Sequence, residues 1–442
     1  MSSLKTNIFF KISMIIVIAL LLLIPATMIR SLVRERENTQ EDAIKEVSSK
    51  WSEEQTLSGP FLSVPFYRYV KEFSKTDSTE KIVRMKEYIH FLPTNLNMTG
   101  KIFPEKRTRG IYEIVVYNST FTISGIFQKV KFTDLEIPLK DILFDKAFVS
   151  LGINDLRGIE KQIVLSWNND SCLFNSGTVS YDVVESGINA PVTISSGDSS
   201  SYKFSFNMTL KGSQKLFFTP VGEITDISTS STWNNPSFNG AFLPDTRTVN
   251  DSGFSANWNI LHLNRNFPQR WVGNKFETSS SSFGIDLLLP VDSYQKTTRS
   301  VKYALLFICF TFIVFFFVEV LNKIFIHPVQ YILVGIALVI FFTLLLSISE
   351  HVTFNMAYII SGVSTLLLIA GYIKAILKST LLTSLISGIL FFLYSFIFVI
   401  IQLQDYALLI GSIGLFIILC LAMYFSRKID WYNLKLGEGN IP

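Results

Sequence analysis

Apolar residues dominate two parts of the chain, and a longer part with mixed polar and apolar positions lies between them. From residue 303 to 425 the apolar runs are roughly 18–22 residues long, enough to cross ~30 Å of hydrocarbon at about 1.5 Å per residue. Only six residues of this stretch carry a formal charge, mainly at the breaks between runs. The pattern predicts five membrane-spanning helices, at about 303–321, 329–348, 355–373, 380–401 and 406–425.

These five runs are expected to be helical because backbone amides in lipid must form their hydrogen bonds within the segment. A buried helix of a soluble protein is the alternative, but five successive helices without a polar face do not suit a soluble fold. The charged residues of the stretch are Glu319, Lys323, Glu350, Lys374, Lys378 and Asp405.

A sixth span is predicted near the start of the sequence, from about Ile8 to Ile29. Its apolar run has a basic flank at Lys5 and Lys11. A cleaved signal peptide is the competing interpretation, but no A-x-A cleavage site follows the run. We therefore favour an uncleaved signal anchor.

The orientation of six spans can be read from the basic residues of short loops and tails, which concentrate in the cytosol. Placing both ends of the chain in the cytosol puts Glu350 and Asp405 in the short outer turns, which contain no Lys or Arg. Arg30 and other basic residues on the outer side conflict with this, but long domains translocate largely regardless of charge. The residues then assigned to the cytosol are Lys5, Lys11, Lys323, Lys374, Lys378, Arg427, Lys428 and Lys435.

The mixed stretch begins with helical periodicity and continues with strand patterns. Ala43, Ile44, Val47 and Trp51 share one helical face, so the first span is expected to extend as a stalk that ends by residue 58. After that, β-branched and aromatic runs alternate with Gly, Asn, Ser and Pro turns, which favours an antiparallel sandwich.

The predicted fold is therefore a multi-pass α-helical membrane protein with six spans and a large, mostly β, sandwich-like domain outside the cytosol, between spans 1 and 2. The expected divisions are a signal anchor at 1–30, a helical stalk at 31–58, a β-rich domain at 59–302, a five-helix bundle at 303–425 and a cytosolic tail at 426–442. A weak repeat, with residues 103–112 resembling 243–254 and 166–169 resembling 232–235, suggests either two related β modules or, as we prefer, chance similarity.

Charge and cysteine content narrow the function classes. The net charge is +4, but residues 31–302 hold 30 basic and 30 acidic residues. The large domain therefore lacks the excess of positive charge that is typical of nucleic-acid-binding domains. A hydrophobic fraction of 49% excludes a disordered chain. The sequence contains only three Cys, which excludes a fold that is held together by several disulfides.

Few residues indicate chemistry, and no common catalytic, nucleotide or metal motif is present in the sequence. Glu319 is the sharpest candidate because an ionisable residue within a span is a functional hypothesis by default. Its structural alternative is contact with headgroup water or pairing with Lys323. Glu350 and His351 form either a ligand or proton-relay site or a solvated turn that joins two helices. His327 precedes Pro328, and because Pro suits the first turn of a helix, a structural role at the helix start is favoured for His327.

Several motifs along nearly the whole chain are specific enough to suggest a family. The sequence resembles the inner-membrane protein CreD family at 290–294, 302–307, 327–351, 405–412 and 427–432, and in the mixed stretch at 107–112, 155–159 and 235–244. The first motif of the mixed stretch makes Arg107 and Arg109 further candidates. The resemblance implies a Gram-negative inner-membrane protein whose large β domain is periplasmic. It also implies a link to envelope integrity and envelope stress, and it supplies no catalytic residues.

Two function classes follow. The first is a non-enzymatic envelope protein whose β domain binds a periplasmic, lipid or peptidoglycan partner. The second is a transporter or exporter component that uses the five-helix bundle as a conduit. The deep spans offer mainly Ser, Thr and Tyr as polar groups, which favours the first class. The expected partners are the lipid bilayer and an unidentified envelope component, with no nucleic acid, no cofactor, no metal and no enzymatic activity.

Overall fold

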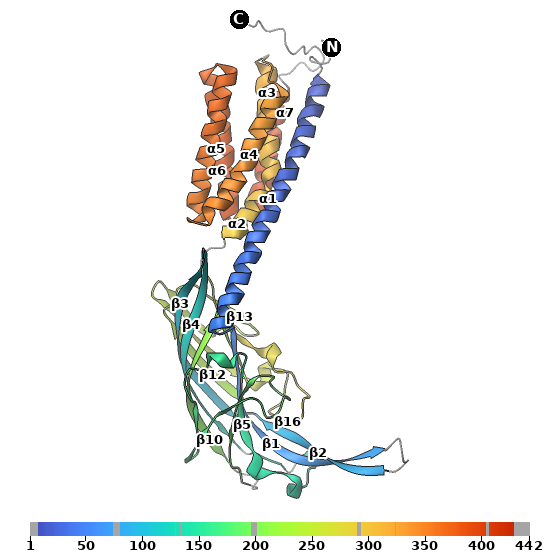
Figure 1. Ribbon diagram of the computed structural model, residues 1–442, viewed down its shortest axis with the longest axis vertical. Coiled ribbons are helices and arrows are strands. Elements are labelled where there is room, and N and C mark those ends of the chain that lie inside the picture. Colours follow the sequence, from blue (N-terminus) through green and yellow to red (C-terminus); the bar gives the residue numbers. More distant parts are fainter. Residues whose placement is uncertain are drawn as a thin grey trace. The chain divides into compact units, whose positions relative to one another are not determined.

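The computed structural model describes residues 8–73, 80–128, 130–132, 135–195, 201–289, 293–322, 324–403 and 406–427 (Figure 1). The chain divides into two compact units, Met1–Glu41 with Val291–Pro442, which we call the membrane unit, and Asp42–Pro290, which we call the β unit. Some residues used above for orientation or for the family resemblance lie outside the described ranges: Lys5, Pro290–Asp292, Lys323, Asp405, Lys428–Tyr432 and Lys435.

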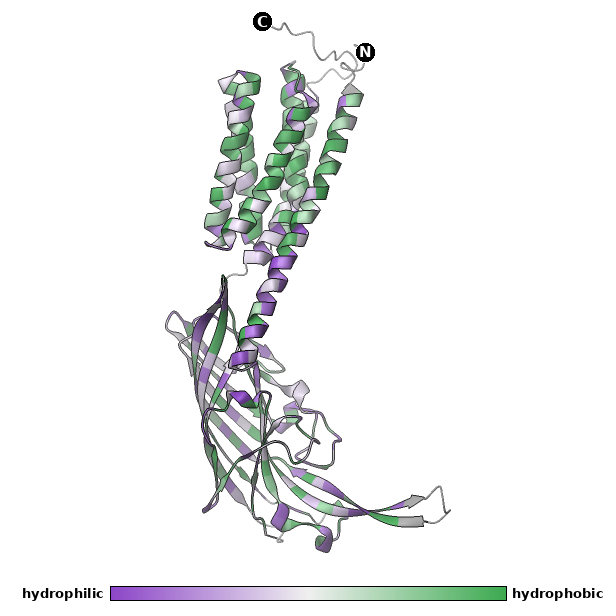
Figure 2. Ribbon diagram, in the orientation of Figure 1, coloured by the Kyte–Doolittle hydropathy of each residue, from purple (hydrophilic) through white to green (hydrophobic). Residues whose placement is uncertain are grey.

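Six helices of the described chain are long and apolar enough to cross a membrane, which confirms the six predicted spans. Figure 2 shows hydrophobic residues along most of the last five helices and along the first half of the first helix, whose second half is mainly hydrophilic. The last five are 18 to 24 residues long, which suits a hydrocarbon layer of about 30 Å. The six are α1 (Ile8–Trp51), α3 (Ala304–Leu321), α4 (Pro328–Ser349), α5 (Phe354–Leu377), α6 (Thr380–Gln402) and α7 (Ala407–Ser426).

Helix α1 is one uninterrupted helix of 44 residues that contributes to both units. Pro25 lies inside it, and a transmembrane helix tolerates this because neighbouring groups can satisfy the carbonyl that Pro leaves free. The helix ends at Trp51 and the first strand begins at Gln55. The helical stalk therefore ends before residue 58, the limit that the sequence suggested.

A short polar helix, α2 (Ser293–Lys302), was not expected, because this segment was assigned to the β-rich domain. The hydroxyls of Thr297 and Ser300 donate to carbonyls four residues earlier, at 2.8 and 3.0 Å. Both hydroxyls therefore find partners inside their own helix. The segment groups with the membrane unit, whereas the sequence pattern placed it at the end of the β-rich domain.

The β unit contains two sheets. One sheet has the order β13-β17-β11-β1-β5-β9-β8, with β2 beside β1 and β16 beside β2. Most pairs are antiparallel, as expected, but β1 runs parallel to β11. The bounds are β1 (Gln55–Phe73), β2 (Glu80–Phe91), β5 (Phe148–Ile153), β8 (Asn175–Ser176), β9 (Gly187–Pro191), β11 (Lys215–Thr219), β13 (Pro236–Gly240), β16 (Arg270–Val272) and β17 (Phe283–Leu287).

The second sheet has the order β14-β15-β12-β3-β4-β10-β6-β7. Here too one pair, β12 with β3, is parallel. The bounds are β3 (Asn95–Arg109), β4 (Tyr112–Phe127), β6 (Val164–Trp167), β7 (Asp170–Leu173), β10 (Tyr202–Ser213), β12 (Ile224–Ser231), β14 (Thr246–Asn250) and β15 (Gly253–Leu261).

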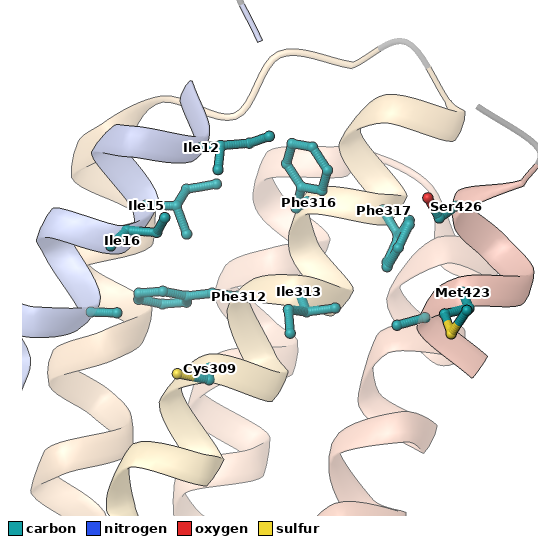
Figure 3. Close-up of a pocket in the computed structure, with 12 residues that line it drawn as sticks. Ile12, Ile15, Ile16, Cys309, Phe312, Ile313, Phe316, Phe317, Met423 and Ser426 are labelled. Atoms are coloured by element: carbon teal, nitrogen blue, oxygen red, sulfur yellow. The ribbon is translucent and has the colours of Figure 1, made fainter. Parts of the chain in front are cut away.

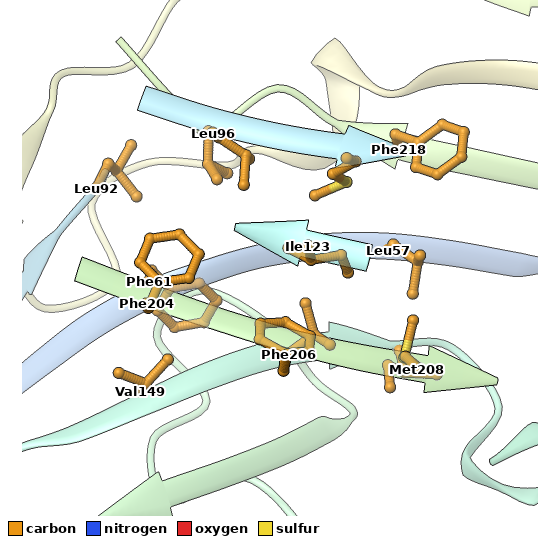
Figure 4. Close-up of a cluster of buried hydrophobic side chains, with 14 of the residues drawn as sticks. Leu57, Phe61, Leu92, Leu96, Ile123, Val149, Phe204, Phe206, Met208 and Phe218 are labelled. Carbon is orange, nitrogen blue, oxygen red and sulfur yellow. The ribbon is translucent and has the colours of Figure 1, made fainter. Parts of the chain in front are cut away.

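One hydrophobic core joins the two sheets (Figure 4). Along β10, buried and exposed residues alternate, as expected for a strand with one face on a core. Phe121 of β4 meets Phe218 of β11 with ring centroids 5.5 Å apart, and Phe238 of β13 meets Trp258 of β15 at 5.9 Å. These pairs connect one sheet to the other, so the β unit is a sandwich.

The weak sequence repeat does not correspond to two sandwiches. Residues 103–112 and 243–254 both belong to hairpins of the same sheet, β3–β4 and β14–β15. Each hairpin turns at a glycine with positive φ, Gly110 at 62° and Gly253 at 135°. Shared turn requirements therefore account for the similarity.

Candidate functional site

The membrane unit contains a buried ion pair between α1 and α3. The carboxylate of Glu319, on α3, contacts the ammonium group of Lys11, on α1. Glu319 is 0% exposed and Lys11 is 6% exposed. The two residues are 308 positions apart in the sequence, so the pair connects the first span to the C-terminal bundle.

Neighbouring groups satisfy the remaining hydrogen-bonding positions of the pair. The hydroxyl of Tyr331, on α4, donates to Glu319 Oε2 at 3.0 Å. The backbone N–H of Ile326 donates to Glu319 Oε1 at 3.1 Å. Lys11 Nζ donates to the carbonyl of Ile326 at 2.7 Å and lies 4.2 Å from the ring centroid of Phe325. The pair is therefore part of a closed network across α1, α3, α4 and the α3–α4 connection.

This network differs from what the sequence suggested for Glu319. Contact with headgroup water was one structural alternative, and the full burial of the residue contradicts it. The other, pairing with Lys323, concerns a residue outside the described ranges. Sequence reasoning counted Lys11 only as a basic flank, although a lysine next to the apolar run from Ile12 needs a partner when it is buried.

His327 lies at the start of α4 and caps it. Its Nδ1 accepts the backbone N–H of Val329 at 3.4 Å, while the His327 N–H donates to the side-chain oxygen of Gln330 at 2.9 Å. Pro328 occupies the first helical position, where its missing N–H loses no hydrogen bond. These contacts give His327 a structural role in the helix start.

Glu350 and His351 do not form a joint site. Glu350 accepts a hydrogen bond from the hydroxyl of Tyr294 at 3.2 Å, and Arg36 Nε lies 3.7 Å from the same oxygen. His351 is exposed, and its backbone N–H donates to the carbonyl of Ile348. Glu350 thus links α1, α2 and the end of α4 within the membrane unit.

Arg107 and Arg109 contact the end of α1 within the β unit. Arg109 donates to the carboxylate of Glu46 at 2.8 Å. The guanidinium of Arg107 lies 4.3 Å from the ring centroid of Trp51, and Lys211 Nζ lies 4.7 Å from the same ring. Both arginines therefore hold the last turns of the helix against the sheets.

The motif at 155–159 reaches the same helix end. Arg157 forms two hydrogen bonds of 2.9 Å to the Asp155 carboxylate and also donates to the carbonyl of Ser49. Asp155 in turn accepts the N–H of Glu53 at 2.9 Å and the hydroxyl of Ser52 at 3.2 Å. Burial opposes ionisation of Asp155, but Arg157 and the backbone N–H of Glu53 outweigh it and lower the pKa of Asp155 to about 2.

The cavities of the membrane unit are apolar. One of about 480 Å³ lies between α1, α3 and α7, where Ile12, Phe312 and Met423 surround it (Figure 3). Another of about 370 Å³ lies between α3, α6 and α7. The described part of the chain holds no group of His, Cys, Asp and Glu side chains suited to a metal ion.

Comparison with known proteins identifies the family. The family model described as inner membrane protein CreD matches residues 7–432. The chain belongs to the CreD family. A CreD-family relative, the inner membrane protein CreD of Escherichia coli strain K12, is 32% identical over 439 residues, which cover 98% of this chain and 96% of the relative. This confirms the resemblance that the sequence motifs indicated.

Two solved structures that resemble part of this chain have low scores. An M1 zinc metallopeptidase from Deinococcus radiodurans has a TM-score of 0.20 and 8% identity, over 41% of this chain and 42% of that one. A mutant of that peptidase bound to a peptide substrate has a TM-score of 0.19 and 8% identity, over 38% and 39%. Scores this low carry no argument about fold or activity.

The buried pair predicts a specific pattern of stability changes. Lys11→Met leaves the Glu319 carboxylate buried without its cation and should lower the free energy of unfolding by about 3–5 kcal/mol. Adding Glu319→Gln should restore most of this loss, because Gln is neutral and can still accept from Tyr331. Unfolding of the purified full-length protein in detergent measures both values. Equal stability of the single variant and the unsubstituted protein would contradict the pairing.

Proposed function

We propose that this protein is a non-enzymatic inner-membrane protein that contributes to cell envelope integrity, and that its β unit binds an envelope partner. Membership of the CreD family supports the location in an inner membrane. The observation that favours binding over transport is the closed Lys11–Glu319 network, since both charges of the pair are already neutralised. A membrane unit of this kind anchors the β unit.

The proposed topology places both ends of the chain in the cytosol and the β unit in the periplasm. Lys374, at the end of α5, Lys378, between α5 and α6, and Arg427, after α7, then lie on the cytosolic side. Glu350, between α4 and α5, lies on the other side. This distribution supports the proposal because basic residues of short loops favour the cytosol.

Transport by the bundle is the alternative function. The hydroxyls of Ser361 and Tyr394 are buried and have no hydrogen-bond partner among the described residues, which leaves them available to a polar substrate inside the bundle. However, neither residue lines the two apolar cavities described above. A conduit for a polar substrate needs several polar groups along one path. The anchoring function therefore accounts better for this membrane unit.

Complementation of a deletion strain separates the two functions. The variant Lys11→Met/Glu319→Gln lacks both titratable groups of the pair but remains neutral inside the membrane. We expect it to rescue survival under envelope stress as well as the unsubstituted gene does. Immunoblots of membrane fractions check that equal amounts of protein are inserted. Loss of rescue at an equal inserted amount would contradict the anchoring function and favour proton-coupled transport.

Reporter fusions test the proposed topology. A reporter that is active only in the periplasm should be active when it is joined after Asn169 or after Val352. It should be inactive when it is joined after Lys378, because that loop is then cytosolic. Activity after Lys378 would overturn the six-span orientation.

A further inference from the structure

A polar cleft of about 740 Å³ lies in the β unit. Its floor includes Thr56 and Ser58 of β1, and its two walls come from the segments 183–186 and 277–282. Leu57, between the two floor residues, is 0% exposed and belongs to the core. Because side chains alternate along a strand, the cleft lies on the face of the sheet that points away from the core. Its volume is within the range of about 300–1,000 Å³ that is typical of small-molecule sites.

Both walls of the cleft are joined to the sheet by hydrogen bonds. On one side, the backbone N–H of Ile153 donates to the carbonyl of Ser186 at 3.1 Å. On the other side, Ser282 Oγ lies 2.9 Å from Thr219 Oγ1, which lies 2.7 Å from Ser58 Oγ. These bonds set the shape of the cleft before any ligand binds, which limits the entropic cost of binding.

One buried hydroxyl of the cleft lacks a partner. Thr278 lines the cleft although it is only 3% exposed. Its side chain does not cap the short 3₁₀ helix Ser279–Ser281 that follows, and it has no other hydrogen bond with the described residues. A buried polar group without a hydrogen bond is costly. Thr278 therefore indicates that a ligand with a hydrogen-bonding group completes the cleft.

The ionisable side chains that line the cleft are all acidic. Glu185 lies in one wall and Glu277 in the other, and no Lys, Arg or His of the described chain lines the cleft. The Glu277 carboxylate accepts a hydrogen bond from Ser279 Oγ at 2.6 Å. Neither carboxylate forms an ion pair with a described residue. The complementary ligand is therefore a cation with positive charge near both walls.

Two kinds of cation do not suit this cleft. The described residues hold no group of His, Cys, Asp and Glu side chains suited to a metal ion, and the cleft is far larger than one ion. A basic peptide could not bind here by adding a strand, because β1 and β5 already pair with each other and with β11 and β9 on their outer sides. The remaining candidates are small organic cations.

The apolar part of the lining narrows the choice further. Val183 and Val184 belong to the same wall as Glu185 and present methyl groups to the cleft. They suit a methylene chain that connects two charged groups. No aromatic ring of the described chain lines the cleft, although a sugar commonly packs its C–H face on one. The lining therefore matches ammonium groups that are separated by methylene groups.

We propose that this cleft binds a polyamine, whose ammonium groups contact Glu185 and Glu277 and whose methylene chain lies along Val183 and Val184. An N–H of the polyamine donates to Thr278 Oγ1. This inference goes beyond the proposed function, because the ligand is a small molecule and its binding does not require the envelope partner.

Isothermal titration calorimetry with spermidine and the full-length protein, in nanodiscs of zwitterionic lipid, measures this binding. We expect Glu185→Gln/Glu277→Gln to weaken binding by about tenfold or more, because charged hydrogen bonds are lost. Thr278→Val should weaken it about fivefold, because one neutral hydrogen bond is lost. The matched control Glu136→Gln/Asp251→Asn removes the same charge at two exposed positions outside the cleft and should change affinity less than about twofold.

Thermal unfolding without spermidine should be the same for all three variants and the unsubstituted protein, so a loss of binding is not a loss of fold. Tetralysine and Ca²⁺ serve as comparison probes. Three results would overturn the polyamine site. They are no binding of spermidine by the unsubstituted protein, equal weakening by the two double variants, or tighter binding of tetralysine or Ca²⁺ than of spermidine that depends on Glu185 and Glu277.

Discussion

Lys11 and Glu319 bring opposite charges together in a region where neither could remain alone. An ionised side chain at membrane depth is costly, by a few kcal/mol on insertion scales, and each partner removes that cost from the other. Because the two residues lie on α1 and α3, their pairing also decides which helices touch. Tyr331 and the backbone of Ile326 complete the network, so α4 and the α3–α4 connection are fixed by the same charges.

The long helix α1 is held at both of its ends. Near its beginning, Lys11 pairs with Glu319 within the membrane unit. In its last turns, Arg109 pairs with Glu46 and Arg157 donates to a backbone carbonyl within the β unit. The two family motifs of the β unit that contain these arginines thus serve the same helix end. Arg109 and Arg157 are themselves exposed, and the contacts described for them join the strands to this helix end.

The sequence predicts the spans well because a membrane span is a local property of about 20 residues. It also predicts a β sandwich, because alternation and turn residues are local as well. The partners of individual strands are not local. Thus the parallel pairing of β1 with β11 joins Gln55 to Leu216 and has no signature in either segment.

The same distinction applies to the candidate site. Glu319 stands out in the sequence because it interrupts an apolar run, but its partner lies 308 residues away and resembles an ordinary basic flank. The contact between Tyr67 and Arg84 also depends on register, since the two side chains meet only when β1 and β2 pair in this alignment. Helix α2 was missed because its polar sequence resembles a loop until its hydroxyls bond within the helix.

These contacts describe a membrane unit in which a buried lysine and a buried glutamate neutralise each other. Oxidative cross-linking tests the central claim, that the Lys11–Glu319 pair holds α1 against the bundle. In a protein without its three native cysteines, Leu22→Cys and Gly335→Cys should form a disulfide, because a Cβ on Gly335 would lie 3.3 Å from Leu22 Cγ, the position that the cysteine Sγ takes. The account predicts a high yield with the pair intact and a clear loss of yield when Lys11→Met is added. An unchanged yield with Lys11→Met, or no disulfide with the pair intact, would contradict it.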